Sequence, residues 1–119
     1  MEPEPRVVLI VDDDAAVNRA LSRAVRSLGF SVHAFESGEA LLASSATQSP
    51  AILLLDLHLP GVSGAELISV LQASAPGLRI VVMTGRDVAG AREACLAAGA
   101  TSYITKPISR RDLSALFDG

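Results

Sequence analysis

The chain has 119 residues and a formal charge of −3 at pH 7, a size that suits one compact domain and leaves no room for a second. Half of the residues are hydrophobic, yet there are only three Phe, one Tyr and no Trp, so aliphatic side chains must build the core. No apolar run reaches the roughly 18 residues of a membrane span, a single cysteine excludes an internal disulfide, and no basic cluster stands out. We therefore expect a cytoplasmic domain over residues 6–119, after a disordered leader of residues 1–5, without membrane or direct nucleic-acid contact.

Strand-like and helix-like patterns alternate along the chain. Residues 7–11 form an apolar run typical of a central parallel strand, and Asp14 is placed to cap a helix that ends at Gly29. The apolar face predicted for that helix consists of Ala16, Val17, Ala20, Leu21, Ala24, Val25 and Leu28. Four further strands are predicted over residues 31–35, 52–55, 80–83 and 102–105. The helices between them are predicted over residues 38–46, 63–75 and 88–98.

Two later helices begin with a capping signal. Ser63 and Glu66 have the spacing of a capping box, and Ser109 with Asp112 opens the last helix. Five alternating strand–helix units predict an α/β fold with one five-stranded parallel sheet and helices on both of its faces. The simplest such topology is the doubly wound, flavodoxin-like sheet with strand order 2-1-3-4-5.

Polar side chains follow the predicted strands at their carboxyl ends. The first strand ends in Asp12 and Asp13, the third in Asp56, the fourth in Thr84 and the fifth in Lys106. Ligand sites of doubly wound sheets lie at this edge. We therefore expect these carboxylates, the hydroxyl and the ammonium group to meet there.

Clustered carboxylates repel one another unless a cation neutralises them, and hard oxygen ligands suit Mg²⁺. We expect Asp13 and Asp56 to bind Mg²⁺ directly and Asp12 to act through water. A carboxylate beside a divalent cation can attack a phosphoryl group, because the metal offsets charge on the transferred oxygens. Lys106 and the Thr84 hydroxyl can then hydrogen-bond those oxygens.

Four stretches carry a resemblance to a known family: VLIVDDD at residues 8–14, LLLDLHLPGVSG at 53–64, VVMTG at 81–85 and GATSYITKP at 99–107. In this order and at these separations they resemble the receiver domains of two-component response regulators, which include the chemotaxis response regulator. The resemblance covers essentially the whole chain after the leader. It implies a phosphoacceptor switch rather than an enzyme that turns over external substrates.

The resemblance also implies a role for each matching residue. Asp12 and Asp13 correspond to the acidic pair that holds Mg²⁺. Asp56 corresponds to the residue that accepts a phosphoryl group from a histidine kinase or a histidine phosphotransfer protein. Thr84 corresponds to the switch hydroxyl, and Lys106 to the lysine that contacts the phosphate.

Further implied features surround this set. Tyr103 corresponds to the switch aromatic residue, and the peptide bond before Pro107 is expected to be cis. His58 stands where the family donates a backbone carbonyl to the metal. The side chains of His58 and Arg86 are expected to flank the phosphoryl group, and we hypothesise that they modulate its hydrolysis.

Phosphorylation is then expected to draw Thr84 toward the phosphoryl group and to let Tyr103 rotate inward from solvent. The face formed by the fourth helix, fifth strand and fifth helix would change and control an output domain or partner, with a homodimer through this face as a further possibility. The sequence leaves open the cognate kinase and whether the domain stands alone.

Simpler interpretations compete at single positions. Asp14 is interpreted as a helix cap alone, Cys95 as a core residue and His33 as structural or exposed. Tyr103 as an ordinary half-buried strand residue remains an alternative.

Three other functions fit the sequence less well. A phosphatase of the haloacid-dehalogenase type needs a second Asp two residues after the nucleophile, where this chain has His58, and a cap domain is lacking. A flavodoxin-like cofactor binder needs a phosphate-cradling loop after the first strand, where three carboxylates stand instead. A receiver that is never phosphorylated is disfavoured by the intact acidic set.

Overall fold

The computed structural model describes residues 6–61 and 63–118. Its strands are β1 (Val7–Val11), β2 (Ser31–Phe35), β3 (Ala51–Asp56), β4 (Leu78–Thr84) and β5 (Ser102–Thr105). Its helices are α1 (Ala15–Ser27), α2 (Gly38–Ala43), α3 (Gly64–Ser74), α4 (Ala91–Ala98) and α5 (Arg110–Asp118), with a short 3-10 helix, η1, over Ser45–Gln48. The predicted leader, residues 1–5, lies outside the described residues.

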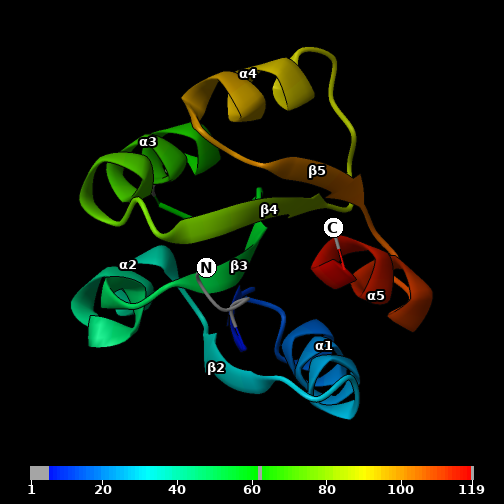
Figure 1. Ribbon diagram of the computed structural model, residues 1–119. Helices are drawn as coiled ribbons and strands as arrows, with labels where there is room; N and C mark the ends of the chain where they lie inside the picture. Colours follow the sequence, from blue (N-terminus) through cyan, green and yellow to red (C-terminus); the bar gives the residue numbers. More distant parts are fainter. Residues whose placement is uncertain (1–5, 62, 119) are drawn as a thin grey trace.

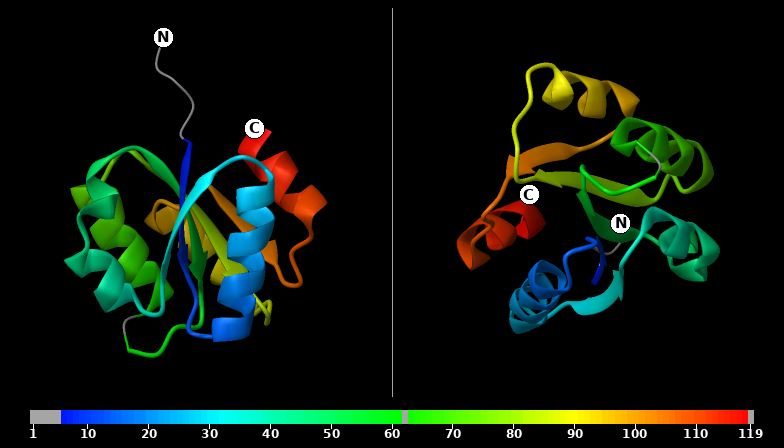
Figure 2. Two further views of the ribbon diagram at one scale, coloured as in Figure 1. Left: turned by 90° about the horizontal axis from the view of Figure 1, so that it is seen from below. Right: turned by 180° about the vertical axis from the view of Figure 1, so that it is seen from behind.

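The strands form one parallel sheet in the order β2-β1-β3-β4-β5 (Figure 1). Helices α1 and α5 cover one face of this sheet, and α2, α3 and α4 cover the other (Figure 2). The predicted fold class and strand order are confirmed. All six residues of the central strand β3 are buried, because helices cover both of its faces.

Alternate residues of the inner strands pack on opposite faces of the sheet, since successive side chains of a strand point in opposite directions. Leu9 and Leu53 belong to the core cluster beneath α2, α3 and α4. Ile10 and Leu54 belong to the cluster beneath α1 and α5. The aliphatic runs of the sequence therefore fill two cores, and they hold the strand ends in fixed positions relative to one another.

Two helices are shorter than predicted, and local backbone conformation explains both differences. Helix α4 begins at Ala91 rather than near residue 88, because Gly90 adopts a left-handed conformation with φ of +84°. Helix α2 ends at Ala43 rather than at residue 46. Ser44 is extended there, and its hydroxyl accepts the Ala46 N–H to start η1.

The predicted capping residues occupy the expected places. Asp14 accepts hydrogen bonds from the backbone N–H groups of Ala16 and Val17 at 3.0 and 3.2 Å. Ser63 Oγ accepts the Glu66 N–H at 3.2 Å. At the last helix the bonds are reciprocal, since Ser109 Oγ accepts the Asp112 N–H at 3.0 Å and the Asp112 carboxylate accepts the Ser109 N–H at 2.9 Å.

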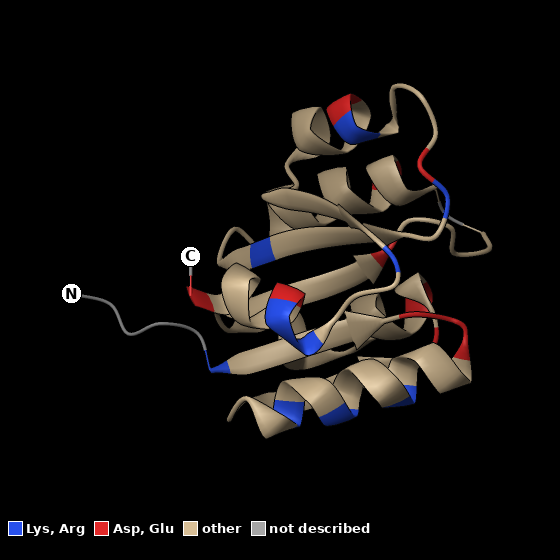
Figure 3. Ribbon diagram, turned by 90° about the vertical axis from the view of Figure 1, so that its right-hand side faces the viewer, with Lys and Arg blue, Asp and Glu red and all other residues tan. Residues whose placement is uncertain are grey.

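The surface of α1 differs from the sequence-based prediction in two ways. Its buried residues are Asn18, Leu21, Ser22 and Val25, whereas Ala16 and Ala20, which the periodicity places on the apolar face, are exposed. Three arginines at helical spacing also form an exposed basic row along this helix (Figure 3), consisting of Arg19, Arg23 and Arg26. This row is not a cluster in the sequence itself, because residues four and three positions apart meet only once the helix forms.

Across the described residues, helices reach neither the length nor the apolar character that a membrane crossing requires.

Candidate functional site

Three carboxylates meet at the carboxyl edge of the sheet. One oxygen from each of Asp12, Asp13 and Asp56 lies within 4.8 Å of the other two. The strand order explains this meeting, because β1 and β3 are neighbours while the helices that follow them pack on opposite faces of the sheet. A crevice opens where the chain turns in opposite directions after two adjacent strands. The predicted acidic cluster is therefore present.

The ammonium group of Lys106 lies among these carboxylates. Its Nζ donates to Asp12 Oδ2 at 2.8 Å and lies 3.6 Å from Asp56 Oδ1. Burial lowers the pKa of Lys106, but the hydrogen bond and charge of Asp12 and the charge of Asp56 outweigh it and leave that pKa above its ordinary value. Lys106 is therefore held in its charged form beside Asp56. The peptide bond between Lys106 and Pro107 is cis.

Asp56 is 6% exposed, and the surrounding protein disfavours its ionised form. Burial raises the pKa of Asp56, while the His58 N–H, which donates to Asp56 Oδ1 at 3.2 Å, and the charge of Lys106 lower it. The charges of Asp12 and Asp13 add to the raised pKa. The net effect is a pKa above the ordinary value, so a further cation at this edge would be stabilised by the cluster.

The carboxylate oxygens of the cluster differ in how many hydrogen bonds they already accept from the protein. Asp12 is 1% exposed, and its two oxygens accept the Asp14 N–H at 2.9 Å and the Lys106 ammonium. Asp13, by contrast, is exposed. Its carboxylate and that of Asp56 line a cleft of about 470 Å³. This donor set fits a hard divalent cation that keeps several of its waters, as Mg²⁺ does.

Asn18, which the sequence analysis did not single out, fixes the position of the acidic loop. Its Nδ2 donates to the backbone oxygens of Asp12 and Phe35, both at 3.0 Å. These bonds join the ends of β1 and β2 directly below the acidic pair. A polar residue within the apolar pattern of α1 was the available signal.

Thr84, at the end of β4, is fully buried, and its hydroxyl is already engaged by neighbouring groups. Thr84 Oγ1 donates to the Arg86 carbonyl at 2.6 Å and accepts the Arg86 N–H at 3.0 Å. His58 Nε2 lies 2.9 Å from Thr84 Oγ1 and 3.3 Å from the Arg86 carbonyl oxygen. His58 and Arg86 also line the acidic cleft, and the His58 imidazole contacts Thr84.

The Tyr103 ring is buried, whereas it was expected to lie in solvent and to rotate inward on phosphorylation. It is 7% exposed and belongs to the core cluster that also contains Cys95. Its phenol donates to Asp87 Oδ1 at 3.0 Å. Burial raises the pKa of Tyr103, and the hydrogen bond to Asp87 raises it further. The expectation of an exposed ring was wrong, because Asp87, a loop residue with no distinct sequence signal, provides the hydrogen-bond acceptor that makes burial of the phenol favourable.

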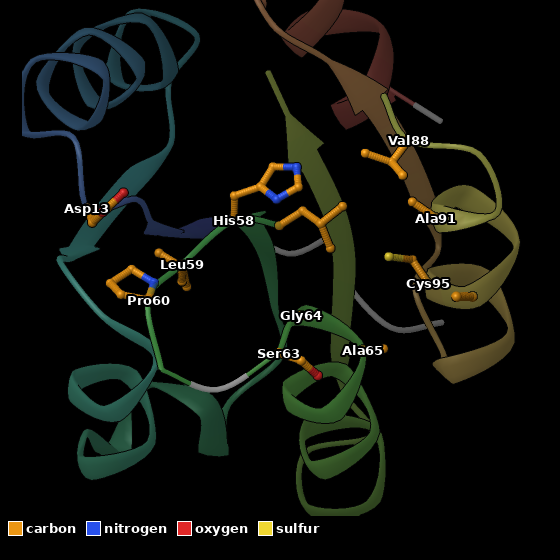
Figure 4. Close-up of a pocket in the computed structure, with 12 residues that line it drawn as sticks. Asp13, His58, Leu59, Pro60, Ser63, Gly64, Ala65, Val88, Ala91 and Cys95 are labelled. Atoms are coloured by element: carbon orange, nitrogen blue, oxygen red, sulfur yellow. The ribbon is translucent and has the colours of Figure 1, made fainter. Parts of the chain in front are cut away.

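A larger and mainly apolar pocket of about 670 Å³ lies beside the acidic cleft. Val88, Ala91 and Cys95 line one side of this pocket, and Ser63 and Gly64 line another (Figure 4). Burial raises the pKa of the Cys95 thiol, and its position confirms the predicted core role. Most of the charged groups at this edge line the smaller cleft rather than this pocket.

Comparison with known proteins identifies the family of the chain. The model of the response regulator receiver domain matches residues 8–118. The chain belongs to the family of response regulator receiver domains. Members of this family are phosphorylation-dependent switches, not enzymes that turn over external substrates.

Curated relatives show the same receiver region within longer proteins. The chain is 34% identical over 106 residues to the probable transcriptional regulatory protein TcrX of Mycobacterium tuberculosis, which covers 89% of this chain and 45% of TcrX. It is 33% identical over 112 residues to the DNA-binding transcriptional regulator NtrC of Klebsiella pneumoniae, which covers 94% of this chain and 24% of NtrC. This receiver therefore spans less than half the length of these relatives.

Solved structures of receiver domains superpose closely. The CheY-like receiver domain protein of Methanospirillum hungatei gives a TM-score of 0.87 at 29% identity, over 96% of this chain and 91% of that one. The BeF3-activated DrrB receiver domain gives a TM-score of 0.84 at 26% identity, over 96% of this chain and 95% of that one.

Proposed function

We propose that this receiver accepts a phosphoryl group on Asp56 from a phosphohistidine of a sensor histidine kinase or a histidine phosphotransfer protein. The observation that carries this proposal is the meeting of three carboxylates with the Lys106 ammonium at one strand edge. Asp56 ends the central strand β3, and burial raises its pKa. In the reaction, a carboxylate oxygen of Asp56 attacks phosphorus, and the bond between phosphorus and the histidine nitrogen breaks.

Mg²⁺ is the cofactor that the donor set fits. Asp13 and Asp56 are the proposed direct ligands, with the backbone carbonyl of His58, and Asp12 acts through water because both of its oxygens are engaged. The bound ion would offset negative charge on the transferred oxygens.

Lys106 and Thr84 contact the phosphoryl group in this proposal. The Lys106 ammonium pairs with one phosphoryl oxygen while it still contacts Asp12, so the positive charge of Lys106 stabilises the phosphorylated state. Thr84 can donate to a phosphoryl oxygen only after its hydroxyl leaves the Arg86 carbonyl. Phosphorylation therefore has to rearrange the loop that follows β4.

His58 and Arg86 are proposed modulators of hydrolysis, because both line the cleft that holds Asp56. His58→Ala and Arg86→Ala variants should lose the phosphoryl group at altered rates. Unchanged rates in both variants would reject this role.

The proposed readout surface is the face formed by α4, β5 and α5. A groove of about 600 Å³ on this face is lined by Asp87, Arg92 and Asp112, among others. We propose that it contacts an output domain, a partner protein or a second copy of the chain in the cytoplasm. Light scattering with and without phosphorylation tests the homodimer. With a net charge of −3, we assign protein partners rather than nucleic acid to this domain.

The proposal is tested by intact-mass measurement after incubation with acetyl phosphate and Mg²⁺. Wild-type protein should gain one phosphoryl group, and Asp56→Asn should gain none. Asp14→Asn is the matched control, because Asp14 follows the acidic pair yet caps α1, so it should be phosphorylated like wild type. An adduct of equal size on Asp56→Asn would overturn the proposal.

A further inference from the structure

The apolar pocket of about 670 Å³ between the start of α3 and α4 has no part in the proposed phosphoryl chemistry, which belongs to the smaller acidic cleft (Figure 4). Its volume falls within the range of roughly 300–1,000 Å³ that is usual for small-molecule sites. Aliphatic and thiol groups form most of its wall, among them Leu57, Leu59, Ala91 and Cys95. The pocket is therefore large enough and apolar enough to hold the body of a small ligand.

The two walls of this pocket belong to the folded core. The Leu57 N–H donates to the Met83 carbonyl of β4 at 2.8 Å, so this wall is tied to the sheet. Gly64 packs closely beside it, since a Cβ at Gly64 would lie 3.2 Å from the Leu57 carbonyl oxygen. On the opposite wall, Cys95 is 1% exposed and belongs to the core cluster beneath α3 and α4. A ligand therefore meets a preformed apolar surface.

One end of the pocket carries negative charge. Asp13 lines the pocket and is exposed, and Figure 4 shows it on the side opposite Cys95. Asp13 also lines the adjoining acidic cleft, where carboxylates outnumber cations: Asp12, Asp13, Asp14 and Asp56 against Arg86 and Lys106. The pocket thus combines an apolar body with an excess of negative charge at one end, which is complementary to a ligand with a cationic head.

We propose that this pocket binds a small amphipathic organic cation, a primary amine or an amidine on an aromatic or aliphatic body. The body packs between Leu57 and Cys95, and the cation pairs with the Asp13 carboxylate. Burial of the apolar body supplies most of the binding free energy, because an ion pair with an exposed carboxylate contributes little. The charge acts instead on selectivity, since the same carboxylates repel an anion with an identical body.

Three probes that share one body test the selectivity: 4-phenylbutylamine, 4-phenylbutan-1-ol and 4-phenylbutyrate. Each is titrated into nitrogen-15-labelled protein without Mg²⁺, and backbone amide shifts give the site and the affinity. The amine should shift the amides of Leu57, Ala65 and Cys95. It should bind about fivefold more tightly than the alcohol, the upper value for an exposed ion pair, and the carboxylate should bind most weakly. Shifts confined to residues outside the pocket, or equal affinities for amine and carboxylate, would overturn the proposal.

A variant of Asp13 separates the ion pair from the apolar contacts. Asp13→Asn keeps the shape of the side chain but loses its charge, so the amine should bind about fivefold more weakly while the alcohol binds as before. Glu93→Gln removes an exposed carboxylate of α4 outside the pocket and should bind the amine like wild type. Equal affinities of Asp13→Asn and Glu93→Gln for the amine would reject the pair with Asp13.

A second pair of variants tests the place of the apolar body. Ala91→Leu puts a larger side chain into the pocket and should weaken the amine and the alcohol alike. Ala97→Leu makes the same change on the same helix, at an exposed position outside the pocket, and should bind both probes like wild type. Unweakened binding to Ala91→Leu would reject the pocket as the site. If Ala91→Leu failed to fold, the amide shifts of the wild type would still decide where the body lies.

Competition with Mg²⁺ rests on the proposed function, in which Asp13 is a metal ligand. Mg²⁺ should then weaken binding of the amine and leave that of the alcohol unchanged. An amine that binds in the pocket through Asp13 but is indifferent to Mg²⁺ would count against the metal role of Asp13. The titrations without Mg²⁺ would still decide the proposal for the pocket.

Discussion

At the ends of β1 and β3 the functional side chains come directly from the strands, whereas at the ends of β4 and β5 they are joined through a loop. Asp12 and Asp56 end or follow buried strands, so the two cores fix their positions. Thr84 is hydrogen-bonded to Arg86, and Tyr103 is hydrogen-bonded to Asp87, the next residue of the loop, by bonds that can exchange partners. The ends of β1 and β3 thus form an acidic half of the edge, which concentrates negative charge. The ends of β4 and β5, with the loop after β4, form a loop half, whose hydrogen bonds can rearrange.

The two halves of the edge also differ in electrostatic energy. In the acidic half, buried charges of the same sign lie together, and the net charge of the cluster favours a bound cation. In the loop half, the hydroxyl and phenol have partners, so no cation is needed there. Removing charges should therefore alter chemistry in the first half, and removing hydrogen bonds should alter the coupling in the second.

The largest effect is expected from Lys106→Met, which removes the ammonium group that reaches the acidic cluster from the end of β5. Phosphorylation by acetyl phosphate with Mg²⁺ should slow by about 100-fold, as for the loss of one group that stabilises a developing anion. A time course of intact mass measures this rate. Arg19→Met, which removes an exposed cation from α1, should react like wild type; equal rates for the two variants would show that Lys106 has no such role.

Thr84→Ala should weaken the loop half while leaving Asp56 reactive. The variant should still gain the phosphoryl group, but the change at α4–β5–α5 should be about tenfold less favourable, as expected for a lost hydrogen bond to a charged acceptor. Amide hydrogen exchange of α4, β5 and α5 before and after phosphorylation measures this coupling. Thr84→Ser keeps the hydroxyl and should behave like wild type. A normal response in Thr84→Ala would exclude Thr84 from the switch.

Asp13 and Asp14 are adjacent, and their substitutions should separate metal binding from capping. Asp14→Ala should lower the free energy of unfolding by about 1 kcal/mol, because α1 loses its N-cap, with Mg²⁺ affinity unchanged. Asp13→Ala should instead lower Mg²⁺ affinity with little effect on stability without metal. Denaturant unfolding and a Mg²⁺ titration give both quantities, and the opposite pattern would reverse the two assignments.

The smallest effect concerns the pH dependence of stability. Because the pKa of Asp56 is raised in the folded protein, its ionised form disfavours folding at neutral pH. Asp56→Asn should therefore raise the melting temperature at pH 7 without metal by about 3 °C. The difference should vanish below the ordinary carboxyl pKa of about 3.9, where Asp56 is protonated in both states. It should also shrink with Mg²⁺, which stabilises only the wild type. A destabilised Asp56→Asn at pH 7 would contradict the raised pKa.

Much of the fold could be predicted from the sequence because its signals are local. Apolar runs ending in polar residues marked the inner strands, and Asp14, Ser63 and Ser109 marked helix starts that the structure confirms. The boundaries of α2 and α4 could not be predicted as well. They depend on single backbone conformations at Ser44 and Gly90, which periodicity does not reveal.

By itself, the sequence determined the alternation of strands and helices and the identity of the strand-end groups Asp12, Asp13, Asp56, Thr84 and Lys106. Parallel strands bring their ends to one edge whatever the details of packing, so those residues could be grouped in advance. Only the tertiary structure decided that His58 contacts Thr84, that Asn18 supports the acidic loop and that Asp87 holds Tyr103 in the core. These contacts join residues 6 to 26 positions apart through side-chain geometry, and neither periodicity nor spacing along the chain encodes that geometry.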